Sequence, residues 1–141
     1  MKLTTKGRYA VMAMADLATY QNGKPVSLVD ISLRQNISLS YLEQLFSKLK
    51  NEKLVKSVRG ASGGYVLEKN PKDIKISNII FAVDEQVKTL NCKRESKKGC
   101  NGRSTKCITH NLWDDLEQHI NKFFDNVSLN DLIKQKRLDI N

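Results

Sequence analysis

The sequence lacks most features of membrane-bound and secreted proteins. None of its 141 residues form an apolar stretch of the roughly 18 residues that a membrane-spanning helix needs. Its first residues do not resemble a signal peptide, because Arg8 and Asp16 interrupt the apolar positions. Three cysteines are an odd number, which argues against a closed disulfide framework and suits a reducing compartment. We therefore expect a soluble, cytoplasmic protein with one domain, or with a small domain and an oligomerisation arm.

Acidic residues are also scarce. The chain has 24 Lys and Arg against 15 Asp and Glu, which gives a net charge of +9. Residues 1–70 and 88–107 each carry a net charge of +6, whereas residues 71–87 and 108–141 are slightly acidic. This asymmetry favours a polyanion as the partner of the N-terminal half, although a basic protein without such a partner also fits the charge alone.

Two helices are predicted in the first 36 residues. Residues 7–20 carry an apolar stripe at helical spacing, followed by turn residues. A shorter helix is predicted to start after Ser27, an N-cap residue with Asp30 three positions later, and to end at Asn36. The stripe of the first helix consists of Ala10, Ala13, Met14 and Leu17, and Leu28, Ile31 and Leu33 are predicted to face inward from the second.

A third helix is predicted within ISLSYLEQLFSKLKNEKLV, residues 37–55. Ser40 and Glu43 match the capping box S-x-x-E, and Ser38 is a rival N-cap two residues earlier. Leu42, Leu45, Phe46 and Leu49 form the apolar side. The other side presents side chains that can bind base edges or phosphates, namely Ser40, Tyr41, Glu43, Gln44, Ser47 and Lys48.

These residues suggest specific DNA contacts. Gln44 can pair with adenine, Glu43 can accept from the cytosine amino group, and Ser40 can contact bases or phosphate. Glu43 could instead serve only the capping box.

Residues 54–58 and 64–68 are predicted to be strands of a hairpin. Arg59 leads its glycine-flanked tip, where it can enter a minor groove or remain an exposed hairpin arginine. Helix–turn–helix followed by a hairpin is the order of a winged helix.

The C-terminal half is predicted to be helical around a loop. Residues 76–83 predict a short helix with Ile79, Ile80 and Val83 buried, residues 88–107 predict a loop, and a long amphipathic helix starts near Thr109. Ser128 is predicted to cap a last short helix. The long helix could pack on its own domain, but we favour a dimer seam, since paired half-sites call for a two-fold protein. Its stripe is Leu112, Leu116, Ile120, Phe123, Phe124 and Val127, flanked by Trp113.

The predicted loop carries a possible ligand set. Cys92, Cys100, Cys107 and His110 could hold zinc or a two-iron cluster, or the cysteines could be unmetallated thiols; spacing alone leaves these alternatives open. A nucleophile–base pair of Cys107 and His110 is disfavoured because no orienting carboxylate or oxyanion donor is evident nearby, so no enzyme is predicted. His119 is predicted to lie on the helix surface, outside any site that includes His110.

Several motifs together resemble a known family. MKLTTKGRYAVMAMADLA, RQ-x-ISLSYLEQLFSKLK, LVKSVRG-x-x-GGYVL, AVDE and the three cysteines with CITHNLW are similar to the iron–sulfur cluster regulator (IscR-like) family of bacterial winged-helix transcriptional repressors. The resemblance covers about residues 1–132. It implies a mainly α fold with a β-hairpin wing: a winged helix–turn–helix DNA-binding domain at residues 1–75, then a cysteine loop and a helical dimerisation region at residues 76–141.

The resemblance also implies a function. It implies a homodimer that binds palindromic promoter operators, holds one [2Fe–2S] cluster per subunit and represses cluster-assembly genes when clusters are plentiful. The cysteine spacing here, C-x7-C-x6-C-x2-H, is longer in its first two gaps than in similar family members. The implied cluster ligands are Cys92, Cys100, Cys107 and His110, and the implied DNA-facing residues are Ser38, Ser40, Tyr41, Glu43, Gln44 and Arg59.

Overall fold

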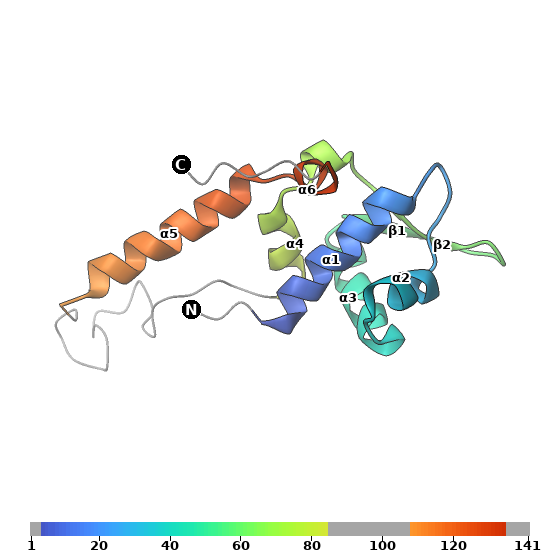
Figure 1. The fold of residues 1–141 in the computed structure, drawn as a ribbon, viewed down its shortest axis with the longest axis horizontal. Helices are drawn as coiled ribbons and strands as arrows, with labels where there is room; N and C mark the ends of the chain where they lie inside the picture. The colour runs from blue at the N-terminus through green and yellow to red at the C-terminus, as the bar shows by residue number, and fades with distance from the viewer. Residues whose placement is uncertain (1–3, 85–107, 135–141) are drawn as a thin grey trace.

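A computed structural model describes residues 4–84 and 108–134 of the chain. Helix α1 spans Thr5–Tyr20 and runs through the centre of the body (Figure 1). The predicted apolar stripe is confirmed, because its four members are completely buried. Residues 85–107, which include the predicted loop at residues 88–107, lie outside the described residues.

Helix α2 spans Leu28–Gln35 and begins where the sequence predicts. The Ser27 hydroxyl oxygen accepts a hydrogen bond from the Asp30 backbone N–H at 3.2 Å. Asn36 adopts the left-handed conformation, with φ of 55°, and ends the helix. Ile31 is buried, but the prediction that Leu33 faces inward is wrong: this residue is 77% exposed, because two positions along a helix rotate it by roughly 200° away from Ile31.

Helix α3 spans Leu39–Asn51 and follows a short turn, which completes the helix–turn–helix. Its N-cap is Ser38, whose hydroxyl oxygen accepts from the Tyr41 backbone N–H at 3.2 Å. The predicted capping box of Ser40 and Glu43 is therefore wrong, because Ser40 already lies inside the first helical turn. Glu43 consequently has no role in starting the helix.

Strands β1 (Val55–Val58) and β2 (Gly64–Leu67) form the predicted antiparallel hairpin, with Val55 opposite Leu67 and Val58 opposite Gly64. Val26 pairs with Tyr65 through two backbone hydrogen bonds of 2.8 and 2.9 Å, which ties the hairpin to the segment before α2. Gly64 permits this approach, since a Cβ there would lie 2.2 Å from the Val26 carbonyl oxygen.

The chain then returns to α1. A short 3-10 turn (Pro71–Asp73) precedes α4 (Ile76–Ala82), and the buried positions predicted for α4 are confirmed. Helix α6 (Leu129–Ile133) starts with a capping box in which Ser128 and Asp131 exchange hydrogen bonds of 3.1 and 3.0 Å. Leu129 donates its backbone N–H to the Ile74 carbonyl at 2.8 Å, so the C-terminal part of the chain is fastened to the N-terminal body.

Helix α5 (His110–Asn126) extends away from this body (Figure 1). Its C-terminal end is packed, because Phe124 is half-buried against the core and Val127 is buried. Further along, Leu112 is 59% exposed, and Trp113, Leu116 and Phe123 are also exposed. The predicted helix is confirmed, and three of its six stripe residues, Leu112, Leu116 and Phe123, are exposed. In the two described intervals, no helix has the length and apolar character needed to traverse a bilayer.

Candidate nucleic-acid interface

The outer face of α3 is polar and exposed. Ser40, Glu43 and Gln44 are exposed and lie at i, i+3 and i+4, which places them on one side of the helix. The opposite side is anchored in the core, where Phe46 is completely buried and its ring contacts the tilted ring of Tyr65 of β2, with centroids 4.9 Å apart. The core therefore holds α3 firmly while its polar face remains available.

Two of the expected DNA-facing residues also have structural contacts. Ser38 caps α3, but a hydroxyl that accepts one hydrogen bond still has a hydrogen to donate to phosphate. Tyr41 is half-buried, and its ring meets that of Tyr9 on α1 edge to face, with centroids 5.8 Å apart and an interplanar angle of 86°. Tyr41 therefore joins α3 to α1 in addition to any contact with a ligand.

Arg59 follows the last residue of β1 and is exposed at the hairpin tip. Gly60 has φ of 122°, a conformation that side chains rarely adopt, so the tip turns sharply just after the arginine. Figure 1 shows the hairpin tip projecting beyond the helices. A guanidinium in this position can reach a surface that also meets α3.

A charged pair lies at the far end of α3. Lys48 Nζ is 2.8 Å from the Asp84 carboxylate, and both side chains remain substantially exposed. This hydrogen bond raises the pKa of Lys48 and lowers the pKa of Asp84. Asp84 has φ of 59° just after α4, so the pair connects the helix–turn–helix to the end of α4. Lys48 is the one member of the predicted outer face engaged by a carboxylate among the described residues.

Of the expected metal ligands, only His110 lies within the described residues. His110 is the first residue of α5 and is buried, 7% exposed, whereas Cys92, Cys100 and Cys107 lie outside the described residues. His119 is exposed on the same helix, as predicted. Within residues 4–84 and 108–134, no three His, Cys, Asp or Glu side chains form a group able to hold a metal ion.

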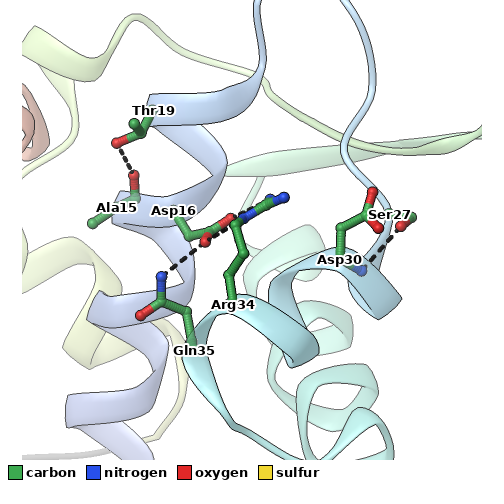
Figure 2. Close-up of polar contacts among 7 residues, drawn as sticks. All are labelled: Ala15, Asp16, Thr19, Ser27, Asp30, Arg34 and Gln35. Carbon is green, nitrogen blue, oxygen red and sulfur yellow. Dashed lines mark hydrogen bonds and ion pairs between the residues drawn. The ribbon is translucent and has the colours of Figure 1, made fainter.

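A buried polar network beside the helix–turn–helix was not predicted from the sequence. Asp16 projects from α1 with a fully buried side chain and receives hydrogen bonds from Arg34 and Gln35 at the end of α2 (Figure 2). The available signal was a carboxylate next to the apolar stripe of α1, an unusual position for a charged residue without a partner.

An apolar groove of about 380 Å³ was also missed. It lies where α1, α4 and α6 meet the C-terminal part of α5, and its walls include Val11, Met12, Ile80, Phe123 and Leu132. Met12 and Phe123 are each more than a third exposed. The groove is thus continuous with the exposed stripe of α5, a relation that could not be seen from separate helical patterns.

Comparisons with known proteins agree with this architecture. A model of the Rrf2 family, described as an iron-dependent transcriptional regulator, matches residues 3–135. The chain is 50% identical over 141 residues to the HTH-type transcriptional regulator IscR of Photorhabdus laumondii, covering 99% of this chain and 84% of the relative. It is 54% identical over 133 residues to IscR of Aliivibrio salmonicida, covering 94% and 77% respectively.

Two solved structures are similar over nearly the full chain. T. potens IscR has a TM-score of 0.76 with 37% identity, covering 97% of this chain and 89% of that one. CymR, the global cysteine regulator of B. subtilis, has a TM-score of 0.80 with 33% identity, covering 97% and 99%. Regulators with different names therefore share the fold, so the chemistry of each must come from its own residues.

Proposed function

This chain belongs to the Rrf2 family of transcriptional regulators, which bind DNA and are not enzymes, and we propose that it is a homodimeric repressor controlled by a [2Fe–2S] cluster. DNA binding is supported above all by the exposed polar face of α3, whose opposite, apolar face is buried in the core. We propose that α3 enters the major groove and that the hairpin tip reaches the adjacent minor groove. Because its target is chromosomal DNA, we place the protein in the cytoplasm.

Each exposed side chain has a distinct role in this proposal. Gln44 pairs with adenine, and Glu43 accepts from cytosine while repelling phosphate in wrong registers. The reading role of Glu43 is favoured by the structure, because the alternative role in a capping box is absent. Ser38, Ser40 and Tyr41 contribute hydroxyl groups to backbone or base contacts, and Arg59 enters the minor groove.

The homodimer is supported by α5. Its exposed stripe is long and apolar, and it continues into the groove between α1 and α4. A second copy of the chain offers the same stripe in a two-fold arrangement, which would remove Leu112, Leu116 and Phe123 from water together. Two recognition helices related by this symmetry would read a palindromic operator.

The donor set fits a two-iron cluster. Cys92, Cys100, Cys107 and His110 fall within 19 residues, and a His in place of one thiolate is compatible with such clusters. When bound, the cluster supplies a redox- and oxygen-sensitive group whose occupancy reflects the supply of clusters. His110 would fix the first turn of α5, so ligation there would favour one arrangement of the dimer helix and hence one spacing of the two α3 helices. Under this proposal, cluster-assembly genes are repressed when clusters are plentiful.

A zinc- or thiol-based repressor is the second candidate. It is favoured by the tight spacing between Cys107 and His110, which is typical of zinc ligands. Anaerobic purification separates the two candidates, since an iron–sulfur protein is brown with visible absorption bands and contains iron and sulfide. A colourless protein that contains zinc would support the second candidate.

A pair of histidine variants tests the ligand set. His110→Ala should lower the iron and sulfide content, whereas His119→Ala, an exposed histidine on the same helix, should leave both unchanged. His110→Cys should retain a cluster, because four thiolates also ligate two-iron clusters. Binding of the loaded and cluster-free wild type to a pool of promoter fragments then tests the coupling, and equal affinity at every fragment would contradict it.

A further inference from the structure

The carboxylate of Asp16 is the most buried charged group among the described residues, and it accepts three hydrogen bonds. Its side chain has no exposed surface, whereas that of Arg34 is 31% exposed. Arg34 Nη2 donates to Oδ1 at 2.7 Å and Arg34 Nε donates to Oδ2 at 3.0 Å, a bidentate arrangement that restrains both distance and orientation. Gln35 Nε2 adds a third hydrogen bond to Oδ2 at 2.8 Å.

The ring of Tyr20 completes the network from the same helix. The Arg34 guanidinium carbon lies 4.0 Å from the centre of this ring, a cation–π contact. The hydrogen bonds that Arg34 donates to the Asp16 carboxylate raise the pKa of Arg34. Arg34 is therefore held between Asp16 and Tyr20, both residues of α1.

The network lies immediately before the recognition helix. Arg34 and Gln35 are the last two residues of α2, and Ser38, the N-cap of α3, follows only three residues after Gln35. The turn between them is itself braced, because the Ser32 hydroxyl donates to the Ile37 carbonyl at 2.6 Å. A shift at the end of α2 would therefore be passed through a short, stiff turn to the first residues of α3.

Helix α1 restrains α3 directly as well. Tyr9 contacts Tyr41 in the first turns of α3, and Tyr9 precedes Asp16 by seven residues, close to two helical turns. One side of α1 thus contacts α2 through Asp16 and α3 through Tyr9.

We infer that Asp16 is a positioning residue for sequence-specific DNA recognition, because it fixes, through Arg34 and Gln35, the angle at which α3 meets the groove. This inference rests on the proposed reading of DNA by α3. Specific recognition needs base-edge contacts of defined geometry, whereas non-specific binding depends on charge near the phosphates. Loss of the network should therefore reduce discrimination between sequences more than it reduces overall affinity.

The test compares two duplexes. One is selected by wild-type full-length protein from a pool of random sequences, and the other is a scrambled duplex of the same length and base composition. Asp16→Asn keeps the shape of the side chain but weakens its hold on Arg34. We expect the ratio of affinities for the two duplexes to fall about tenfold or more, while affinity for the scrambled duplex stays near the wild-type value.

A stability control separates positioning from a general loss of structure. Ile74→Ala removes a completely buried side chain between the 3-10 turn and α4, where the backbone pairs with α6. It should lower Tm without changing the discrimination ratio of the folded protein. If Asp16→Asn also lowers Tm but keeps the wild-type ratio, Asp16 is merely structural and the inference is wrong.

Arg34 provides a second route if Asp16→Asn does not fold. Arg34→Lys keeps the positive charge beside Asp16 but loses the bidentate fork, so the ratio should fall while the salt dependence of binding stays the same. Arg34→Gln tests whether this side chain instead binds phosphate. An equal loss of affinity for both duplexes, with the salt slope reduced by about one, would overturn the inference. If wild-type protein selects no sequence at all, the proposed DNA reading fails, and that result is distinct from each of the others.

Discussion

In the body formed by α1–α4 and α6, apolar faces close on one another, whereas half of the six stripe residues of α5 are exposed. Phe46 and Leu17 have no exposed surface, but Leu112 and Leu116 are 59% and 39% exposed. Asp16 of α1 is enclosed in the same body, because its buried carboxylate accepts hydrogen bonds from Arg34 and Gln35 of α2. The body thus completes its core within one chain, and α5 is suited to completion by a second copy.

Disrupting α5 should have the largest effect on function. Phe123→Asp places a charge in the apolar groove and is expected to give monomers at micromolar concentration. Without the second half-site contact, affinity for a palindromic operator should fall by about 100-fold or more. Sedimentation and operator titration measure both effects. Asn121→Asp adds the same charge on the polar side of α5 and should remain dimeric; a dimeric Phe123→Asp protein would contradict the proposed seam.

Truncating a buried side chain of the body should lower the stability of the monomer itself. Phe46→Ala is expected to lower the free energy of unfolding by about 3–5 kcal/mol, because it leaves a cavity below α3. Leu112→Ala, introduced into a monomeric Phe123→Asp background, should change it by less than about 0.5 kcal/mol. Urea denaturation of both proteins gives the comparison. Similar costs at the two sites would show that α5 also packs within its own chain.

The DNA-reading residues should affect binding without affecting folding. Gln44→Ala and Arg59→Ala are each expected to weaken operator binding by about 1–3 kcal/mol. The effect of Gln44→Ala should be confined to one base-pair position, whereas that of Arg59→Ala should depend on minor-groove width. Titration against single-base operator variants distinguishes them. Lys122→Ala removes a positive charge from α5 instead and should leave affinity unchanged.

The start of α3 can be tested with two neighbouring serines. Ser38→Ala should destabilise the protein by about 1 kcal/mol, because it removes the acceptor for the Tyr41 backbone N–H. Ser40→Ala should stay within about 0.5 kcal/mol, since Ser40 does not cap the helix. Thermal unfolding of the two variants compares their stabilities. A larger destabilisation by Ser40→Ala than by Ser38→Ala would support the capping box predicted from the sequence.

The smallest effect is expected at the exposed ion pair of Lys48 and Asp84. Because Lys48 lowers the pKa of Asp84, the pair stabilises the folded state at neutral pH, and this contribution is lost as the pH falls through that lowered value. The stability difference between wild type and Asp84→Asn should therefore be constant near neutral pH and shrink below about pH 4. It should also shrink in about 1 M salt. A difference that grows in acid would show that the pair does not act this way.

Local sequence patterns predicted the element order well. The stripe of α1, the Ser27 and Ser128 caps, and the end of α2 at Asn36 all depend on residues within a few positions of one another, and each is found as predicted. The inward position of Leu33 was mispredicted, and of the two caps considered for α3 the rival, Ser38, is the one found.

The candidate site was predictable only in part. Apolar periodicity assigned Glu43 and Gln44 to the outer face of α3, because the other side of the same helix had to be buried. The partners of Asp16 could not be predicted in this way, since Arg34 is 18 residues distant and the two meet only when α2 packs on α1. Likewise, the groove beside Phe123 exists only because four helices converge there.

The sequence by itself therefore determined the helices, the wing and the polar face of α3, since these follow from hydrogen bonding and burial among near neighbours. Only the tertiary structure decided that Arg34 and Gln35 meet Asp16 beside the turn before α3 and that Leu112, Leu116 and Phe123 of α5 are exposed. Both depend on contacts between segments far apart in the chain, and whether such contacts form is a property of packing rather than of local pattern.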